Sequence, residues 1–104
     1  MKILAVTACT AGIAHTYIVA EKIQKAAEEM GHQCKVETQG SAGIQNELTA
    51  ADIKDADVIV YAHDIAIRGT DRFKDKRVVD VPISLAMKQP KSLIATIEKK
   101  LNAK

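Results

Sequence analysis

Aromatic residues and cysteines are scarce in this 104-residue sequence. Aromatic side chains make up 3% of the residues and tryptophan is absent, so the chain lacks the stacking surfaces on which single-stranded nucleic acids bind. The two cysteines are too few for the disulfide framework of a small secreted protein. No apolar run approaches the roughly 20 residues that span a bilayer. We therefore expect a reduced, cytoplasmic protein that is not itself membrane-spanning and binds no nucleic acid.

The composition suits one packed domain of residues 1–104. Hydrophobic residues make up 47% of the chain, which is enough for a core but, at this length, for only one. Fifteen basic and 13 acidic residues leave a formal net charge of +2, which does not indicate a polyanionic partner. The basic run at 72–77 is interpreted as a solvated loop, and the alternative is a contact with a local anionic group or an acidic partner.

Apolar periodicity predicts four β-strands. Continuous apolar runs are typical of strands buried on both faces, whereas alternation indicates a strand with one exposed face and a place at the sheet edge, as at 34–38. The strands are expected at 3–6, 34–38, 58–62 and 78–81. The Gly-Ser-Ala-Gly segment at 40–43 and the polar stretch at 63–76 are expected to be loops.

Helices are predicted between and after these strands. Apolar residues recur every three or four positions from Ile13 to Met30, and Gly31 is placed to end that helix. A capping box at Thr49 starts a short helix, and Pro90 fits the first turn of a closing one. This alternation predicts an α/β fold, a four-stranded parallel open sheet in the order 2-1-3-4. Helices on both faces would complete a Rossmann/flavodoxin-like three-layer sandwich.

The segment from Cys9 to Thr16 links the first strand to the first helix, at the edge where ligands bind in open α/β sheets. Its small residues allow successive backbone N–H groups to face one anion, and the helix start adds unpaired N–H donors. A thiol there has a lowered pKa and attacks phosphorus as the thiolate. We predict that Cys9 is a nucleophile in a phosphate-binding loop. The other loop residues are Thr10, Ala11, Gly12, Ile13, Ala14, His15 and Thr16. The alternative is a small buried cysteine after a strand.

The same segment resembles the active-site sequence Cys-Pro-Thr-Gly-Ile-Ala-His-Thr of one family, the fructose-type IIB components of the bacterial phosphoenolpyruvate-dependent sugar phosphotransferase system. Cys9 and residues 12–16 match it in register. Thr10-Ala11 stands where Pro-Thr is usual, so the nucleophile is kept but the loop differs. A second departure lies outside this loop, in the basic run, where Asp75 stands in place of the usual glycine. The resemblance extends over nearly the whole chain, through further segments at 36–41, 56–59 and 72–73.

The resemblance implies a phosphoryl carrier that needs no cofactor. In this family a phosphohistidine of a IIA protein gives its phosphoryl group to the cysteine, here Cys9. The phosphocysteine then passes the group to a sugar, fructose or a related one, bound by the membrane IIC permease. The implied enzyme is a protein-N-phosphohistidine–sugar phosphotransferase that is monomeric and has IIA and IIC as partners. Because sugar binding belongs to IIC, this sequence does not identify the sugar.

Two further residues are candidates for the site. Cysteine phosphatases have Cys-x5-Arg, whose bidentate clamp promotes hydrolysis, where this chain has Cys-x5-His. A histidine therefore fits a carrier, and we expect His15 to orient the loop or add charge, with simple helix capping as the alternative. Asp64 follows the third strand, where a general acid or a partner contact would lie.

His63 is interpreted as a solvated loop residue and Cys34 as a packed core residue. The spacing of potential ligands predicts no metal site.

Three other functions are compatible with the loop. A small cysteine phosphatase would turn over phosphate esters, although the arginine that such enzymes use is missing. A thiol redox protein would need a second thiol near Cys9, but Cys34 begins its strand at the end remote from the loop. A non-catalytic anion-binding module would bind phosphate without forming a covalent adduct.

Overall fold

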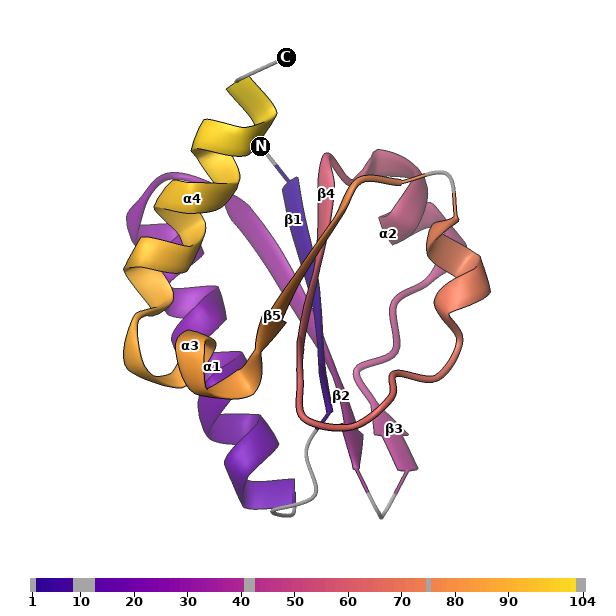
Figure 1. Cartoon of the computed structure of the whole chain (residues 1–104). Helices are drawn as coiled ribbons and strands as arrows, with labels where there is room; N and C mark the ends of the chain where they lie inside the picture. Colours follow the sequence, from indigo (N-terminus) through magenta and orange to yellow (C-terminus); the bar gives the residue numbers. More distant parts are fainter. Residues whose placement is uncertain (1, 9–12, 41–42, 75, 103–104) are drawn as a thin grey trace.

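The computed structural model describes residues 2–8, 13–40, 43–74 and 76–102, and its strands form one mixed sheet (Figure 1). The order along the sheet is β3-β2-β1-β4-β5. The strands are β1 (Lys2–Ala8), β2 (Gln33–Gly40), β3 (Gly43–Gln45), β4 (Val58–His63) and β5 (Val78–Pro82). The predicted order of the four parallel strands is confirmed. The prediction of a four-stranded, all-parallel sheet is wrong, because β3 pairs antiparallel with β2 as a fifth strand.

The short strand β3 changes the environment of β2. Three residues are too few to show a strand pattern, and the glycines at 40 and 43 made the segment resemble a flexible loop. In the structure Gly43 adopts a φ of +116°, which glycine tolerates. β3 pairs with β2 at Thr38, Gln39 and Gly40, and residues 36–39 of β2 are all buried, including the polar side chains of Glu37 and Gln39. The expectation that β2 is an edge strand with an exposed face is therefore wrong.

The described helices begin and end largely where the sequence signals lie. They are α1 (Ile13–Glu29), α2 (Ala50–Asp55), α3 (Ile83–Lys88), α4 (Pro90–Asn102) and the 3₁₀ turn η1 (Thr70–Phe73). Gly31, with φ of +84°, follows α1 and donates its N–H to the Glu28 carbonyl, so the predicted stop is confirmed. Thr49 and Asp52 form the predicted capping box of α2. Neither α3 nor η1 was predicted, since each is short and lacks a side-chain cap.

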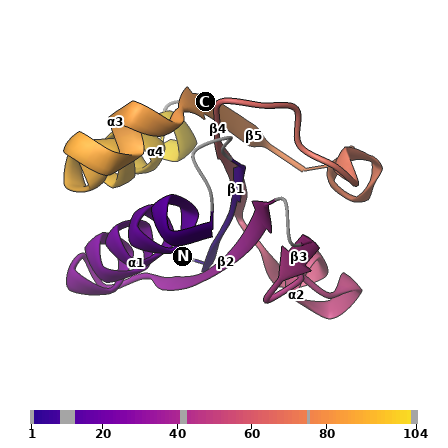
Figure 2. The ribbon, with the colours of Figure 1, turned by 90° about the horizontal axis from the view of Figure 1, so that it is seen from below.

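Two apolar cores lie on opposite faces of the sheet (Figure 2). Helices α1, α3 and α4 cover one face, while α2 and η1 cover the other. Ile3 and Ala5 point into the first core, and Leu4 and Val6, which alternate with them, point into the second. Phe73, the only phenylalanine, is 1% exposed and belongs to the second core. β1 is therefore buried on both faces, as its continuous apolar run predicts.

Candidate functional site

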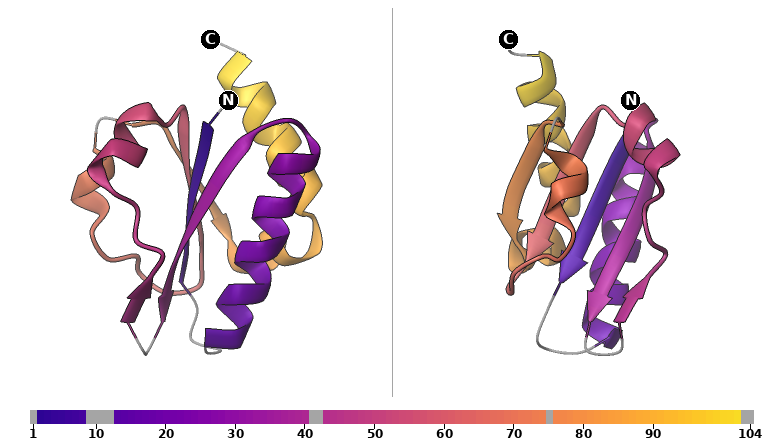
Figure 3. Two further views of the ribbon diagram at one scale, coloured as in Figure 1. Left: turned by 180° about the vertical axis from the view of Figure 1, so that it is seen from behind. Right: turned by 90° about the vertical axis from the view of Figure 1, so that its right-hand side faces the viewer.

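One row of paired residues crosses the sheet at the carboxyl ends of its parallel strands, which lie toward the lower edge in Figure 3. Ala8 of β1 pairs with Gln39 on one side and with His63 on the other. The row continues through Ile44 of β3 and Pro82 of β5. Cys9 follows Ala8 in the chain and α1 begins at Ile13, so residues 9–12 join this row to the start of a 17-residue helix. The predicted phosphate-binding loop therefore follows directly, in the sequence, from a residue of this row.

The pairing of β1 with β4 brings a second predicted residue to this edge. The backbone N–H of Asp64 donates a 2.9 Å hydrogen bond to the carbonyl oxygen of Ala8. The segment that follows β4 therefore lies beside the end of β1. Asp64 is an exposed residue at this edge.

His63 is more firmly held than the sequence suggested. It is the last residue of β4 and is half-buried, with Nδ1 2.6 Å from the carbonyl oxygen of Ile65 and Nε2 2.8 Å from Oδ1 of Asp80. A carbonyl and a carboxylate both accept, so these two contacts favour the charged form of the ring, in which both nitrogens donate. Burial, the largest influence, disfavours this charge, but the bonds to Ile65 and Asp80 outweigh it and raise the pKa of His63. The interpretation of His63 as a solvated loop residue is wrong.

A buried ion pair anchors the neighbouring strand β2. The Glu37 side chain is fully buried, and Arg72 of η1 donates to both of its oxygens, from Nη1 at 2.9 Å and Nη2 at 3.0 Å. The Leu48 N–H and the Gln39 Nε2 add bonds of 2.9 and 2.8 Å. Burial is the largest influence on the carboxyl and would raise the pKa of Glu37, but these hydrogen bonds, led by that of Arg72, keep the pKa below its usual value. Every oxygen of this carboxylate is satisfied.

Gln39 links this ion pair to the loop that follows β4. Its Nε2 donates to the Arg68 carbonyl at 2.9 Å, and its Oε1 accepts from the Arg68 N–H at 2.8 Å. The side chain thus pairs with backbone as a strand would, and it fixes the loop beside the row that contains Ala8. Gln39 and Glu37 were not singled out from the sequence, although both lie in a segment that resembles the family.

The interpretation of the basic run at 72–77 as a solvated loop is wrong for Arg72 and Lys76, whereas Lys74 and Arg77 are exposed. Arg72 binds Glu37 and lies 4.7 Å above the Phe73 ring, while Lys76 donates to the carbonyls of Lys54 and Ala56. The alternative, that the run contacts a local anionic group, is confirmed for Arg72, whose anionic partner is Glu37 of the same chain.

The comparisons with known proteins agree with this architecture. A family model described as "PTS system, Lactose/Cellobiose specific IIB subunit" matches residues 4–96. The PTS system fructose-like EIIB component 2 of Escherichia coli K12 is 48% identical over 97 residues, which cover 93% of this chain and 92% of that protein. The chain belongs to the IIB family of the sugar phosphotransferase system.

Other IIB relatives confirm the fold and show a different chain organisation. The solution structure of an Enzyme IIB subunit from Escherichia coli K12 superposes with a TM-score of 0.92 at 36% identity, covering 98% of this chain and 94% of that one. The fructose-specific EIIABC component of Bacillus subtilis is 48% identical over 101 residues, which are 97% of this chain but 15% of that protein. IIB units are therefore also found within longer phosphotransferase chains. In the part of this IIB chain that the structure describes, no helix is long and apolar enough to cross a membrane.

The structure describes only some of the predicted IIB site residues. Cys9, Thr10, Ala11 and Gly12 lie outside the described residues. Ile13, Ala14, His15 and Thr16 form the first turn of α1, with their side chains outside the description. Asp64 is joined to Ala8 as described above. Among the described residues no group of His, Cys, Asp and Glu is arranged to hold a metal ion.

Cys34 lies far from this edge. It pairs with Ile3, near the start of β1, whereas Ala8 pairs with Gln39, five residues further along β2. At about 3.3 Å per residue the two rows are roughly 17 Å apart. The thiol packs against the first core, and burial, aided by Glu28, raises the pKa of Cys34 to about 12. Cys34 is thus a protonated core thiol, as predicted, and its position disfavours a thiol redox function that uses both cysteines.

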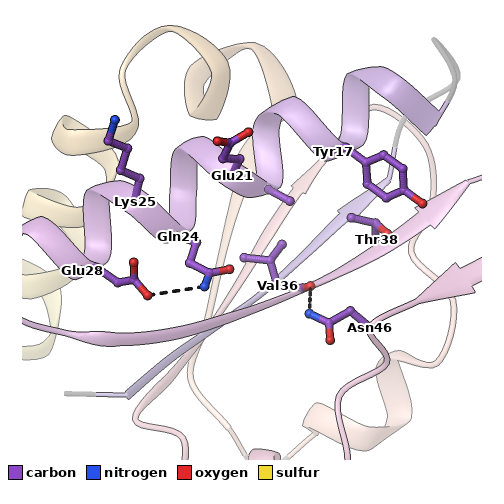
Figure 4. Close-up of a pocket in the computed structure, with 9 residues that line it drawn as sticks. Tyr17, Glu21, Gln24, Lys25, Glu28, Val36, Thr38 and Asn46 are labelled. Carbon is purple, nitrogen blue, oxygen red and sulfur yellow. Dashed lines mark hydrogen bonds between the residues drawn. The ribbon is translucent and has the colours of Figure 1, made fainter.

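A polar groove of about 730 Å³ runs between α1 and β2 (Figure 4). Tyr17 and Thr38 lie at the end nearest the carboxyl edge, and Glu28 lies at the other. Asn46 borders the groove and donates to the Val36 carbonyl at 2.9 Å. The groove was not predicted, because it forms where α1 meets β2 and Asn46, which only the folded chain brings together.

Proposed function

We propose that this IIB chain carries a phosphoryl group on Cys9, between a IIA phosphohistidine and a sugar bound by a IIC permease. The observation that carries the proposal is the row of Ala8, Gln39 and His63 at the carboxyl edge, which Cys9 follows by one residue in the sequence, shortly before the start of α1. A nucleophile at this position stands at the edge where open α/β sheets bind ligands.

The first step exchanges one bond to phosphorus for another. The Cys9 thiolate attacks the phosphorus of the donor's phosphohistidine, an S–P bond forms, and the N–P bond breaks with its electron pair returning to the imidazole. In the second step a sugar hydroxyl attacks the same phosphorus. The O–P bond forms, the S–P bond breaks to restore the thiolate, and the hydroxyl proton passes to a base.

Described groups supply the electrostatics that such a step needs. The dipole of the 17-residue helix α1 directs positive potential toward its first turn, where an anion is stabilised. His63, whose contacts with Ile65 and Asp80 favour its charged form, lies in the row that precedes Cys9 in the sequence. Both favour a thiolate and a phosphoryl dianion over their protonated forms.

The roles of the remaining predicted residues follow from their places in the chain. The backbone N–H groups of residues 10–16 would cradle the phosphoryl oxygens, as in other loops that open a helix. His15, in the first turn of α1, would orient this loop or add charge to it. Asp64 would contact a partner or the incoming hydroxyl, because it is exposed and its backbone N–H binds the Ala8 carbonyl at the end of β1.

The relatives support fructose or a related sugar as the final acceptor. Proteins named fructose-like or fructose-specific are 48% identical to this chain, although the matching family model is described by lactose and cellobiose. Partners of the IIA and IIC types are supported by the relative named as an EIIABC component.

Intact-mass measurement tests the carrier function. The chain is incubated with phosphoenolpyruvate, the general phosphotransferase proteins and a fructose-type IIA protein. We expect an added phosphoryl group of about 80 Da that Cys9→Ser abolishes and Cys34→Ser retains. An adduct that survives Cys9→Ser would refute the assignment.

A second assay separates a carrier from its rivals. Sustained hydrolysis of an aryl phosphate by the isolated chain would identify a phosphatase instead. Saturable phosphate binding without any adduct on Cys9 would identify an anion-binding module.

A further inference from the structure

The loop between β4 and η1 spans residues 64–69, which we refer to as the strap (Figure 1). Its first residue lies against the end of β1, because the Asp64 N–H donates to the Ala8 carbonyl at 2.9 Å. The Ile65 carbonyl then approaches Nδ1 of His63 at 2.6 Å. The start of the strap is thus fixed to the row of paired residues at the carboxyl edge.

A single side chain of β2 holds the far end of the strap. Gln39 is 2% exposed, and its Oε1 accepts from the Arg68 N–H at 2.8 Å while its Nε2 donates to the Arg68 carbonyl at 2.9 Å. This reciprocal pair of bonds fixes both the distance and the orientation of the Arg68 backbone relative to β2. Ile67, one residue earlier, packs against the second core. The strap is therefore attached to β1 and β4 at one end and to β2 at the other.

The Gln39 amide is itself held by a buried polar network. Its Nε2 also donates to Glu37 at 2.8 Å, and Arg72 donates from both terminal nitrogens to the Glu37 carboxylate. Nε of Arg72 donates to the Gly69 carbonyl at 2.8 Å, which adds a second contact beside Arg68. Burying polar groups costs free energy, and a fully bonded network fixes one geometry in return. This network defines one position for the strap.

The anchor stands in the row from which the candidate site begins. Gln39, Ala8 and His63 are paired across the sheet, so their side chains share one face. Gln39 is one strand spacing, roughly 5 Å, from Ala8, and Cys9 follows Ala8 in the sequence. A shift of the strap is transmitted to the end of β1, because Asp64 is bonded to the Ala8 carbonyl.

We propose that Gln39 is a positioning residue for phosphoryl transfer, an inference that rests on the proposed function. Both polar atoms of its amide are bonded within the chain, so it acts through the strap and the end of β1 and does not contact the reacting atoms. Transfer to Cys9 depends on alignment, and a misplacement of about 1 Å costs up to about 100-fold in rate. The effect of Gln39 therefore falls on the maximal rate of transfer and not on binding of the donor.

The test removes the anchor and compares the result with destabilisation elsewhere. Gln39→Leu keeps the approximate size of the side chain and loses the bonds to Arg68 and Glu37. Ile97→Val and Ile97→Ala are the controls, because they destabilise the first core, on the face of the sheet opposite to the strap. Denaturant unfolding ranks all variants by stability. The rate of phosphoryl transfer from phosphorylated IIA protein is then measured against donor concentration.

We expect Gln39→Leu to lower the maximal rate about tenfold, with the half-saturating donor concentration changed by less than about twofold. The Ile97 variants should keep the wild-type maximal rate while they remain folded. A Gln39→Leu variant with the wild-type maximal rate, or a folded Ile97 variant that is equally slow, would overturn the proposal. A change in the half-saturating concentration alone would also overturn it, because Gln39 would then act in donor binding.

A conservative variant, Gln39→Glu, tests the same bonds without changing the shape of the side chain. The charged residues around it are Glu37 of its own strand, Arg72 of η1 and Arg68 of the strap. The ionised side chain is repelled by Glu37, whereas the protonated one donates to Glu37 and accepts from the Arg68 N–H, as the amide does.

We expect the rate of Gln39→Glu, relative to wild type at the same pH, to rise as the pH falls from about 8 to about 6, and the relative rate of Gln39→Leu to stay low. A Gln39→Glu variant that matches wild type throughout also supports the proposal. One that is as slow as Gln39→Leu at every pH contradicts it.

Amide hydrogen exchange separates this proposal from the proposed function. The N–H groups of Asp64 and Arg68 are bonded although both residues are exposed, so both should exchange slowly in the wild type. Gln39→Leu should speed their exchange about tenfold or more, and unchanged exchange would overturn the proposal. If the wild type takes no phosphoryl group but this acceleration occurs, the carrier function fails and Gln39 still positions the strap. If Gln39→Leu transfers as fast as wild type, the positioning role fails and the carrier function stands.

Discussion

Replacing Arg72 by alanine removes the cation that neutralises Glu37, whose side chain is fully buried. Two charge-assisted hydrogen bonds are lost, those from Nη1 and Nη2 to the carboxylate oxygens. The donors on Leu48 and Gln39 remain, so the carboxylate keeps part of its solvation. Breaking one partner of a buried pair costs about 3–5 kcal/mol, and we expect the lower end, about 3 kcal/mol at pH 7, because of these two donors.

The pH dependence of this loss identifies its cause. In the wild type the pKa of Glu37 is lowered, so its contribution to stability is present above the unfolded value near 4.5 and is lost as the pH falls through the folded pKa. Without Arg72 the effect of burial gains weight and the pKa of Glu37 rises. Protonation then relieves the buried charge, so the difference between Arg72→Ala and wild type is expected to shrink as the pH falls from 7 toward 4.

Denaturant unfolding at pH 7 and pH 4.5 measures both effects. Lys74→Ala is the control, because Lys74 is an exposed cation of the same basic run and its loss is expected to change stability by less than about 0.5 kcal/mol. Adding Glu37→Gln to Arg72→Ala should recover part of the loss at pH 7, since it removes the unpaired charge. A cost for Arg72→Ala below about 1 kcal/mol, or one that grows as the pH falls, would refute this account of the ion pair.

Three further changes have defined outcomes. His63→Gln is expected to cost about 0.5–1 kcal/mol at pH 5.5, a figure kept small because Asp80 is exposed. Since the pKa of His63 is raised, that cost should fade as the pH rises above about 6.5, and equal melting curves at pH 5.5 would contradict the charged pair. Thr7→Val is expected to raise the free energy of unfolding by about 1 kcal/mol, because the buried Thr7 hydroxyl has no hydrogen-bond partner in the described part of the chain. A lower free energy of unfolding in urea would show that the hydroxyl does form a hydrogen bond. Alkylation at pH 8 should leave Cys34 unmodified in the folded chain, and rapid modification in the Cys9→Ser variant would contradict its burial.

The parts of the fold that sequence predicted are those carried by local patterns. The continuous apolar runs in β1 and β4 indicated strands buried on both faces, and the pairing of these strands confirms them as the sheet centre. Gly31 and Thr49 marked helix ends through chemistry within a few residues. Such signals survive in any tertiary context, because the capping and turning groups are neighbours in the chain.

The parts that sequence missed depend on groups far apart in the chain. Glu37 alternates with apolar residues as an exposed side chain would, but its partner Arg72 lies 35 residues away and allows it to be buried. β3 showed no strand pattern, since three residues gain their order from pairing with β2. The sequence indicated a solvated His63, because Asp80, which binds its ring, belongs to another strand.

For the site, the sequence by itself placed Cys9 between a buried strand and a helix and identified the family to which the chain belongs. Those conclusions follow from contiguous residues, which no folding step can separate. Only the tertiary structure decided what surrounds that position: the row of Ile44, Gln39, Ala8 and His63. Strand register brings these residues together, and register is set by packing across the whole sheet.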